Sequence, residues 1–318
     1  MTFNWSKWPF VIGVLYSGLI TVLDIYLKLN ISLPWQPISI VGIAVAFYLG
    51  FKNNSSYDRT WEARKIWGSI VNNSRAFGAA VVAFVKGTDQ DAVRKELIYR
   101  HIAWLTVLRY QLRLSREWEH VSNRLNGLYA PTVCEDYFDK MDHELLPFLP
   151  LETIDRYRRQ TNIATQILRD QSVRLQELRD SGYFEDFRHM EFHQLIVSLY
   201  ADQGRSERIK NFPFPRQYAS AAMWLTVVFS AVFPLGMVDI FRPLGDWMLL
   251  ICPVVSGLVI WTFALMEMIG DYSENPFEGT YNDVPITSIA RGIEIDLREM
   301  IGDSDIPEPV KAENGFLM

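Results

Sequence analysis

The chain has 318 residues, of which 49% are hydrophobic, 14% aromatic and 21% charged, and its formal net charge is −6. This acidic balance, with a pI near 5.5, gives no reason to expect a nucleic-acid partner. The two cysteines, Cys134 and Cys252, stand far apart and outside any CxxC pattern. That spacing argues against a disulfide framework and against a cysteine metal site.

Four apolar runs are predicted to be transmembrane helices. The first, residues 8–29, has the length of about 20 residues that a bilayer crossing needs. No A-x-A cleavage signal follows it, so it is interpreted as a retained span rather than a secretion signal. The second run begins near Ser39 and turns polar at Lys52, and the third and fourth runs cover residues 218–238 and 247–268.

The charges around these spans predict their orientation. The loops after the first and third spans are short and poor in basic residues, whereas Arg and Lys are frequent after Lys52. Basic residues favour the cytoplasmic side of a membrane. We therefore expect a multi-pass protein of the cell membrane (inner or plasma membrane) with both termini in the cytoplasm.

The segment between the second and third spans is predicted to be helical and cytosolic. The run FGAAVVAFV, within residues 69–85, is too short to cross a membrane and predicts a helix buried in protein. Residues 89–217 are interpreted as water-exposed helices, among them one long charged helix over Thr153–Asp180 with Gly182 as its cap. No alternating strand pattern of useful length appears, so the predicted fold class is an all-α membrane protein with four transmembrane helices.

These patterns divide the chain into four predicted segments. Residues 1–68 hold the first two spans and a polar motif, residues 69–217 the cytosolic helices, residues 218–270 the other two spans, and residues 271–318 a C-terminal segment and tail. The fourth span ends among the carboxylates Glu267, Asp271 and Glu274. A final amphipathic helix is expected to start at Pro285 and Thr287.

Bulky apolar residues form one stripe along the second span. Ile43, Phe47 and Phe51 are spaced i, i+4 and i+8, which places them on one helix face. Gly42 and Gly50 flank the stripe and would allow neighbouring backbones to approach closely. For a membrane helix taken alone, this pattern is also typical of ordinary helix–helix packing.

A dense polar and aromatic motif follows the stripe directly. Its residues are Asn53, Asn54, Ser55, Ser56, Tyr57, Asp58, Arg59, Trp61, Glu62 and Arg64, with Trp67 and Gly68 after them. Its charged residues are expected to form ion pairs that fix a turn at the membrane exit and a contact between subunits.

This long motif resembles the bestrophin family, including its bacterial branch, and the resemblance covers nearly the whole chain. One departure is Thr60, where the family usually has a second Trp; we expect this to alter local packing rather than the fold. The resemblance implies a homopentamer in the lipid bilayer around one axial pore, with Ile43, Phe47 and Phe51 lining a narrow neck. Five copies of an apolar stripe would form a collar that opposes ions by dewetting.

The resemblance also implies two further sites. Phe214, just before the Pro that leads into the third span, matches a residue that forms a cytosolic aperture in the family. In animal bestrophins an acidic run after Asn-Pro-Phe binds calcium, and here Asn275 and Asp283 are the weak candidates. Because Gly279, Thr280 and Tyr281 carry no carboxylate, a solvated acidic turn is expected instead.

The remaining motifs do not indicate an enzyme or a cofactor. His189 and His193 have the i, i+4 spacing of a zinc pair, but no third ligand stands nearby. No phosphate-binding loop or nucleophile elbow is present in the sequence. The expected function is therefore passive conduction of small monovalent ions, chloride by family default. The alternatives are a sodium-selective channel of the same architecture and a non-conducting membrane scaffold or sensor.

Overall fold

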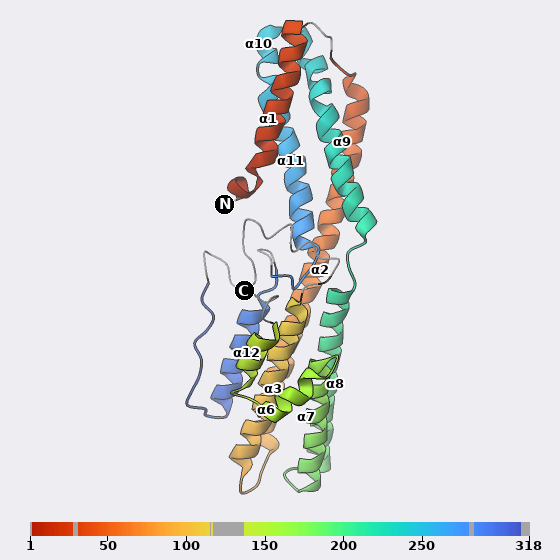
Figure 1. Cartoon of the computed structure of the whole chain (residues 1–318). Coiled ribbons are helices and arrows are strands. Elements are labelled where there is room, and N and C mark those ends of the chain that lie inside the picture. The colour runs from red at the N-terminus through yellow and green to blue at the C-terminus, as the bar shows by residue number, and fades with distance from the viewer. Residues whose placement is uncertain (1, 28–30, 115, 117–136, 280–282, 313–318) are drawn as a thin grey trace. The chain divides into compact units, whose positions relative to one another are not determined.

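The computed structural model describes residues 2–27, 31–114, 116, 137–279 and 283–312, and every regular element in these ranges is a helix (Figure 1). Cys134, Thr280 and Tyr281 lie outside the described residues. The chain divides into two compact units, Met1–Asp58 with Phe214–Glu274 and Arg59–Pro213 with Asn275–Met318. The elements are α1 (Thr2–Leu27), α2 (Trp35–Phe84), α3 (Gln90–Arg113), α5 (Tyr137–Leu145), α6 (Leu151–Arg158), α7 (Ile163–Asp180), α8 (Asp186–Asn211), α9 (Arg216–Phe241), η1 (Arg242–Leu244), α10 (Asp246–Leu249), α11 (Cys252–Ser273) and α12 (Ile286–Met300).

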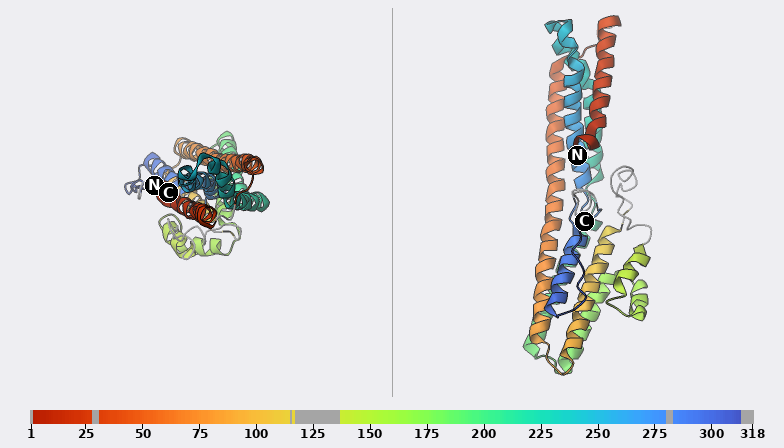
Figure 2. Two further views of the ribbon diagram at one scale, coloured as in Figure 1. Left: turned by 90° about the horizontal axis from the view of Figure 1, so that it is seen from above. Right: turned by 90° about the vertical axis from the view of Figure 1, so that its left-hand side faces the viewer.

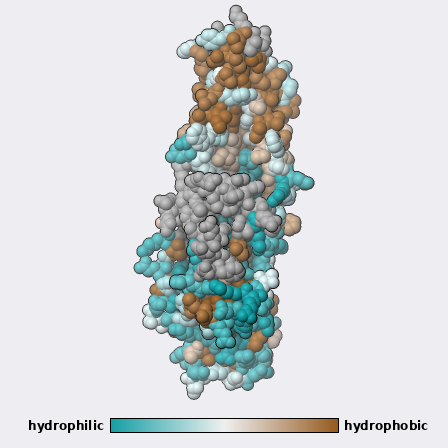
Figure 3. All heavy atoms as spheres, in the orientation of Figure 1, coloured by the Kyte–Doolittle hydropathy of each residue, from teal (hydrophilic) through white to brown (hydrophobic). Residues whose placement is uncertain are grey.

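The first unit contains α1, the first half of α2, α9 and α11, which run alongside one another (Figure 2). Four helical stretches in the described residues are long and apolar enough to cross a membrane: Phe3–Leu27, Trp35–Phe84, Arg216–Leu244 and Trp247–Ser273. Brown, apolar residues cover this unit in the space-filling view, whereas teal, hydrophilic residues prevail on the other unit (Figure 3). The prediction of four apolar spans is therefore confirmed.

Glycine allows the helices of the first unit to pack closely. A Cβ at Gly42 would stand 2.8 Å from the ring of Phe229, and one at Gly257 would overlap the side chain of Val14. At Gly42 the ring of Phe229 from α9 therefore occupies the space, rather than the neighbouring backbone that the sequence led us to expect. Gly50 differs, because no heavy atom lies within 4 Å of the Cβ position that it leaves vacant.

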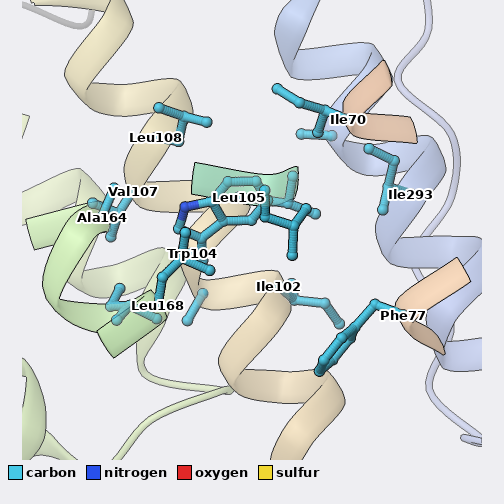
Figure 4. Close-up of a cluster of buried hydrophobic side chains, with 14 of the residues drawn as sticks. Ile70, Phe77, Ile102, Trp104, Leu105, Val107, Leu108, Ala164, Leu168 and Ile293 are labelled. Atoms are coloured by element: carbon cyan, nitrogen blue, oxygen red, sulfur yellow. The ribbon is translucent and has the colours of Figure 1, made fainter. Parts of the chain in front are cut away.

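The second unit is built around α3, and this corrects the expectation of water-exposed helices with one apolar face. Residues 101–108 of α3 are all buried. Trp104 belongs to one buried cluster with Leu105, Leu168 and Ile293 (Figure 4), and its indole N–H donates to the side-chain oxygen of Gln203 at 3.0 Å. Since α7, α8 and α12 all pack on α3, the helix has no solvated side over these residues.

The helix that contains the second span does not end where the polarity changes at Lys52, which is another correction. α2 continues without a break for 50 residues, so FGAAVVAFV forms its last turns and the predicted boundary at residue 68 lies inside it. No proline occurs after Pro37 in this helix. Buried residues also recur at helical spacing through the polar motif, at Leu49, Ser56, Ala63 and Ile70. A change of polarity alone therefore does not end a helix that has neither a breaker nor a cap.

The predicted helix over Thr153–Asp180 is in fact two helices, α6 and α7. The break is fixed by Asn162, whose side-chain oxygen accepts the N–H of Thr165 at 3.1 Å and so caps α7. Gly182 ends α7 as predicted, with φ of 81° and its N–H donating to the carbonyl of Arg179 at 3.0 Å.

Candidate pore-lining site

The apolar stripe lies on the face of α2 that its own chain leaves uncovered. Ile43, Phe47 and Phe51 are 59%, 67% and 70% exposed. On the opposite face of the same helix, Val45 and Leu49 are fully packed in the core of the first unit. The three side chains are therefore available to lipid, to water or to another copy of the chain.

A groove runs beside the stripe. It encloses about 480 Å³ and is lined by Ala46, Phe47, Gly50, Phe51 and Asn54. The groove is open at Gly50, because this residue has no side chain and no other heavy atom lies within 4 Å of its Cβ position. An open groove lined by small and aromatic side chains is the kind of surface against which another helix can pack.

The polar motif is part of a continuous helix rather than a turn, contrary to expectation. Ser56 and Ala63 are buried, while Tyr57, Asp58 and Trp61 are exposed. The motif therefore continues α2 as a helix with both packed and open positions.

Two charged residues of the motif make defined contacts. The Arg59 guanidinium donates to the carbonyls of Ile209 and Phe212 at 3.2 and 2.9 Å, which satisfies carbonyl groups at the C-terminal end of α8. Glu62 pairs with Lys65 at 2.7 Å. Arg59 is thus a structural anchor for α8.

Phe214 packs inside its own unit. Its side chain is only 9% exposed, and its ring lies edge-on to Tyr218 at 6.4 Å between centroids. Tyr218 in turn stacks on Tyr48 of α2 at 6.0 Å. The nearby Phe212 is the exposed phenylalanine of this segment, at 68%.

The acidic segment after α11 is buried, so the expectation of a solvated turn is wrong. Glu274, Asn275 and Glu278 are all buried. Both Asp283 oxygens accept hydrogen bonds: the N–H groups of Phe277, Gly279 and Val284 reach them at 2.7, 2.7 and 2.6 Å. The Arg113 guanidinium joins them at 2.5 Å.

No metal site is expected from the sequence, but three residues considered as metal ligands can now be placed: Asp283, His189 and His193. The donors around Asp283 are N–H groups, whereas calcium takes six to eight oxygen ligands. His189 stacks on Phe184 at 6.3 Å between centroids, and His193 faces solvent. In the described part of the chain, no group of three or more His, Cys, Asp or Glu residues is placed to hold a metal ion.

Sequence reasoning missed one charged contact beside the stripe. Lys52 directly follows Phe51, yet its side chain is buried and its ammonium lies 2.9 Å from Glu267 of α11. Each residue is the first charge at the end of an apolar span, and the signs are opposite. That complementarity between span ends is the signal by which the contact can be found.

Comparison with known proteins agrees with this architecture. A voltage-dependent anion channel-forming protein of Ralstonia nicotianae is 29% identical over 287 residues, covering 90% of this chain and 84% of that protein. The Escherichia coli K12 voltage-dependent anion channel-forming protein YneE is 26% identical over 308 residues, or 96% and 90% of the two chains. The crystal structure of a bacterial bestrophin homologue from Klebsiella pneumoniae has a TM-score of 0.78 at 22% identity, covering 94% of this chain and 99% of that one.

The family itself is shown by a sequence profile. The profile described as Bacterial/Fungal Bestrophin protein matches residues 7–299, from within the first apolar span to the last turn of α12. The chain therefore belongs to the bestrophin family, in its bacterial and fungal branch.

Proposed function

We propose that this protein is a passive ion channel in which several copies, five by the family resemblance, surround one axial pore. The observation that carries the proposal is the stripe of Ile43, Phe47 and Phe51, exposed on a helix whose opposite face is packed. Cyclic symmetry would turn each of these side chains into a ring. The groove at Gly50 gives the adjoining copy a place to pack.

The proposed neck works by hydration rather than by binding. An ion that enters the rings must shed part of its water, because isoleucine and phenylalanine side chains offer no hydrogen bonds in return. A narrow apolar ring can also empty of water and close without a moving plug. Small changes in the spacing of the phenylalanine rings would therefore control conduction.

We propose small monovalent anions such as chloride as the permeant ions. The relatives named voltage-dependent anion channel-forming proteins support this choice. The edges of aromatic rings also carry partial positive charge and can face an anion in the neck. Phe47 and Phe51 supply two such rings in every copy.

One observation favours a second candidate, a channel for monovalent cations such as sodium. Asp58 follows Phe51 by two helical turns on the same face of α2 and is exposed. No salt bridge to Asp58 occurs within the described ranges. In a symmetric assembly this carboxylate would form an acidic ring just beyond the neck, and acidic rings select cations.

The proposed path ends at a cytosolic aperture. Phe214 is the candidate from the family pattern, and the more exposed Phe212 offers the larger surface for an ion path. In this proposal both chain termini lie in the cytoplasm, and the protein is in the cell membrane.

The assembly state tests the channel most directly. The mass of the detergent-purified complex should equal about five chains, as expected for a cyclic ring. Liposomes that contain the protein should then pass chloride down a gradient, with empty liposomes as the control. A monomer in detergent and in liposomes would remove the axial pore and overturn the proposal.

A further inference from the structure

Lys52 is a buried cation immediately beyond the neck residues. Its ammonium lies 2.9 Å from Glu267 and 3.9 Å from Asp271, both on α11. Only 1% of the Lys52 side chain is exposed. A charge buried at the end of a membrane span is costly unless it is paired, so the contact between α2 and α11 is specific in position.

The surroundings allow this pair little freedom. Gly270 of α11 faces α2 at the same level: a Cβ there would overlap the side-chain oxygen of Asn53 and would stand 3.4 Å from Cδ of Lys52. The absence of a side chain at Gly270 therefore leaves room for the side chains of Asn53 and Lys52. Lys52 is confined in that space, with its ammonium directed at Glu267 rather than at solvent.

The helix geometry links Lys52 to the neck. Successive residues of an α-helix point about 100° apart, so Lys52 lies opposite Ile43 and next to Phe51 around the axis of α2. The helix is continuous through both positions. A rotation of α2 that turns Phe51 away from its open face must also pull Lys52 out of its contact with Glu267.

We propose that Lys52 is a positioning residue: its ion pair with Glu267 fixes the rotation of α2 about its own axis and so the direction in which Phe47 and Phe51 point. Any effect of this direction on conduction rests on the proposed function. The rotation of α2 does not depend on the proposed function, and it can be measured separately. The pair is made between α2 and α11 of one chain, so it sets the angle before any copies assemble.

Asn54 and Ser55 report this rotation. They lie about one turn beyond Phe51, on either side of its direction and about 100° apart, and both are exposed. In a background with Cys134→Ser and Cys252→Ala, either position is changed to Cys and labelled with a charged methanethiosulfonate reagent in liposomes. A rotation of α2 raises one labelling rate and lowers the other.

We expect Glu267→Gln and Lys52→Met to change the ratio of the two rates by about tenfold, which corresponds to about 1.4 kcal/mol. Lys52→Arg should keep the ratio, and the exchange Lys52→Glu with Glu267→Lys should return it toward the original value. Arg242→Gln is the matched control, because it breaks the ion pair with Asp24 in the same unit without touching the Lys52 contact.

An unchanged ratio in Glu267→Gln would overturn the inference and leave the pair with a role in stability alone. If Lys52→Met fails to insert into the membrane, Glu267→Gln alone tests the inference. Glu267→Gln keeps a neutral hydrogen-bond acceptor for Lys52, and the carboxylate of Asp271 remains. Failure of the proposed function looks different. In that case Phe51→Cys, in the same cysteine-free background with Lys52 and Glu267 intact, would resist the water-soluble reagent, whatever happens to the ratio.

Discussion

The carboxylate of Asp283 binds the guanidinium of Arg113 at 2.5 Å, and both side chains are buried. The pair joins the C-terminal end of α3 to the start of α12. It also organises the loop before α12, because Asp283 accepts the N–H of Phe277, whose φ of 74° is unusual for a residue with a side chain. This acidic position therefore holds the second unit together.

Asp283→Asn should destabilise the protein strongly. The variant leaves the Arg113 charge buried without its counterion, which costs about 3–5 kcal/mol. Thermal unfolding in detergent measures the loss. Asp305→Asn is the control, since the Asp305 carboxylate is exposed and a surface pair contributes at most about 1 kcal/mol. Equal effects of the two variants would contradict the structural role of Asp283.

The stability of the second unit should fall in mild acid because of His101. The ring is buried, stacks on Phe77 at 5.0 Å and contacts Ser74 Oγ through Nε2 at 2.9 Å. Burial lowers its pKa to about 3. The unfolded chain has the ordinary pKa of about 6.5, so below that pH only the unfolded state takes up the proton, and about 1.4 kcal/mol is lost per pH unit.

Unfolding midpoints measured between about pH 7 and about pH 5 test this slope, a range in which histidine is the main titrating side chain. The slope should be flatter in His101→Gln than in the original protein, while His193→Gln, at an exposed position, should keep it. Parallel slopes in the original protein and His101→Gln would rule out His101 as the cause.

The sequence was informative where the signal is local. Spacing along one helix predicted the stripe of Phe47 and Phe51, and apolar length predicted four spans. The end of α2 was misjudged because polarity changes at Lys52, whereas a helix ends only where a breaker, a cap or lost packing ends it. The partners of Lys52 and Asp283 are 215 and 170 residues away in sequence. The opposite charges at the ends of the second and fourth spans indicate the first contact, but no local pattern indicates the second.

Substitution of two neighbouring phenylalanines, Phe212 and Phe214, can show which of them lines the cytosolic aperture. Phe212→Ala removes an exposed ring, whereas Phe214→Ala removes a ring packed on Tyr218. If the exposed ring narrows the path, Phe212→Ala should raise conductance in planar bilayers and leave thermal stability within about 0.5 kcal/mol. Phe214→Ala should instead cost about 3 kcal/mol or more of stability. If only Phe214→Ala changes the conductance, Phe214 rather than Phe212 lines the aperture.

Asp58 should set part of the charge selectivity. Reversal potentials across a sodium chloride gradient in liposomes give the chloride-to-sodium permeability ratio. Asp58→Asn removes an acidic ring beyond the neck and should shift that ratio toward chloride, by about tenfold if the ring contributes about 1.4 kcal/mol. Arg64→Gln, on another exposed part of the same helix, is the comparison. A ratio that clearly favours sodium in the original protein would make the chloride proposal wrong.

Phe47→Ala distinguishes a channel from a non-conducting scaffold. The change replaces a ring that is 67% exposed, so it should leave folding intact while it widens the proposed collar. A wider collar holds water more readily, and we expect larger currents or loss of closure in planar bilayers. Leu15→Ala, at an equally exposed apolar position on α1, should leave the current unchanged. If neither the original protein nor Phe47→Ala passes ions, the scaffold interpretation is favoured, and the cytosolic helices become the place to look for a partner.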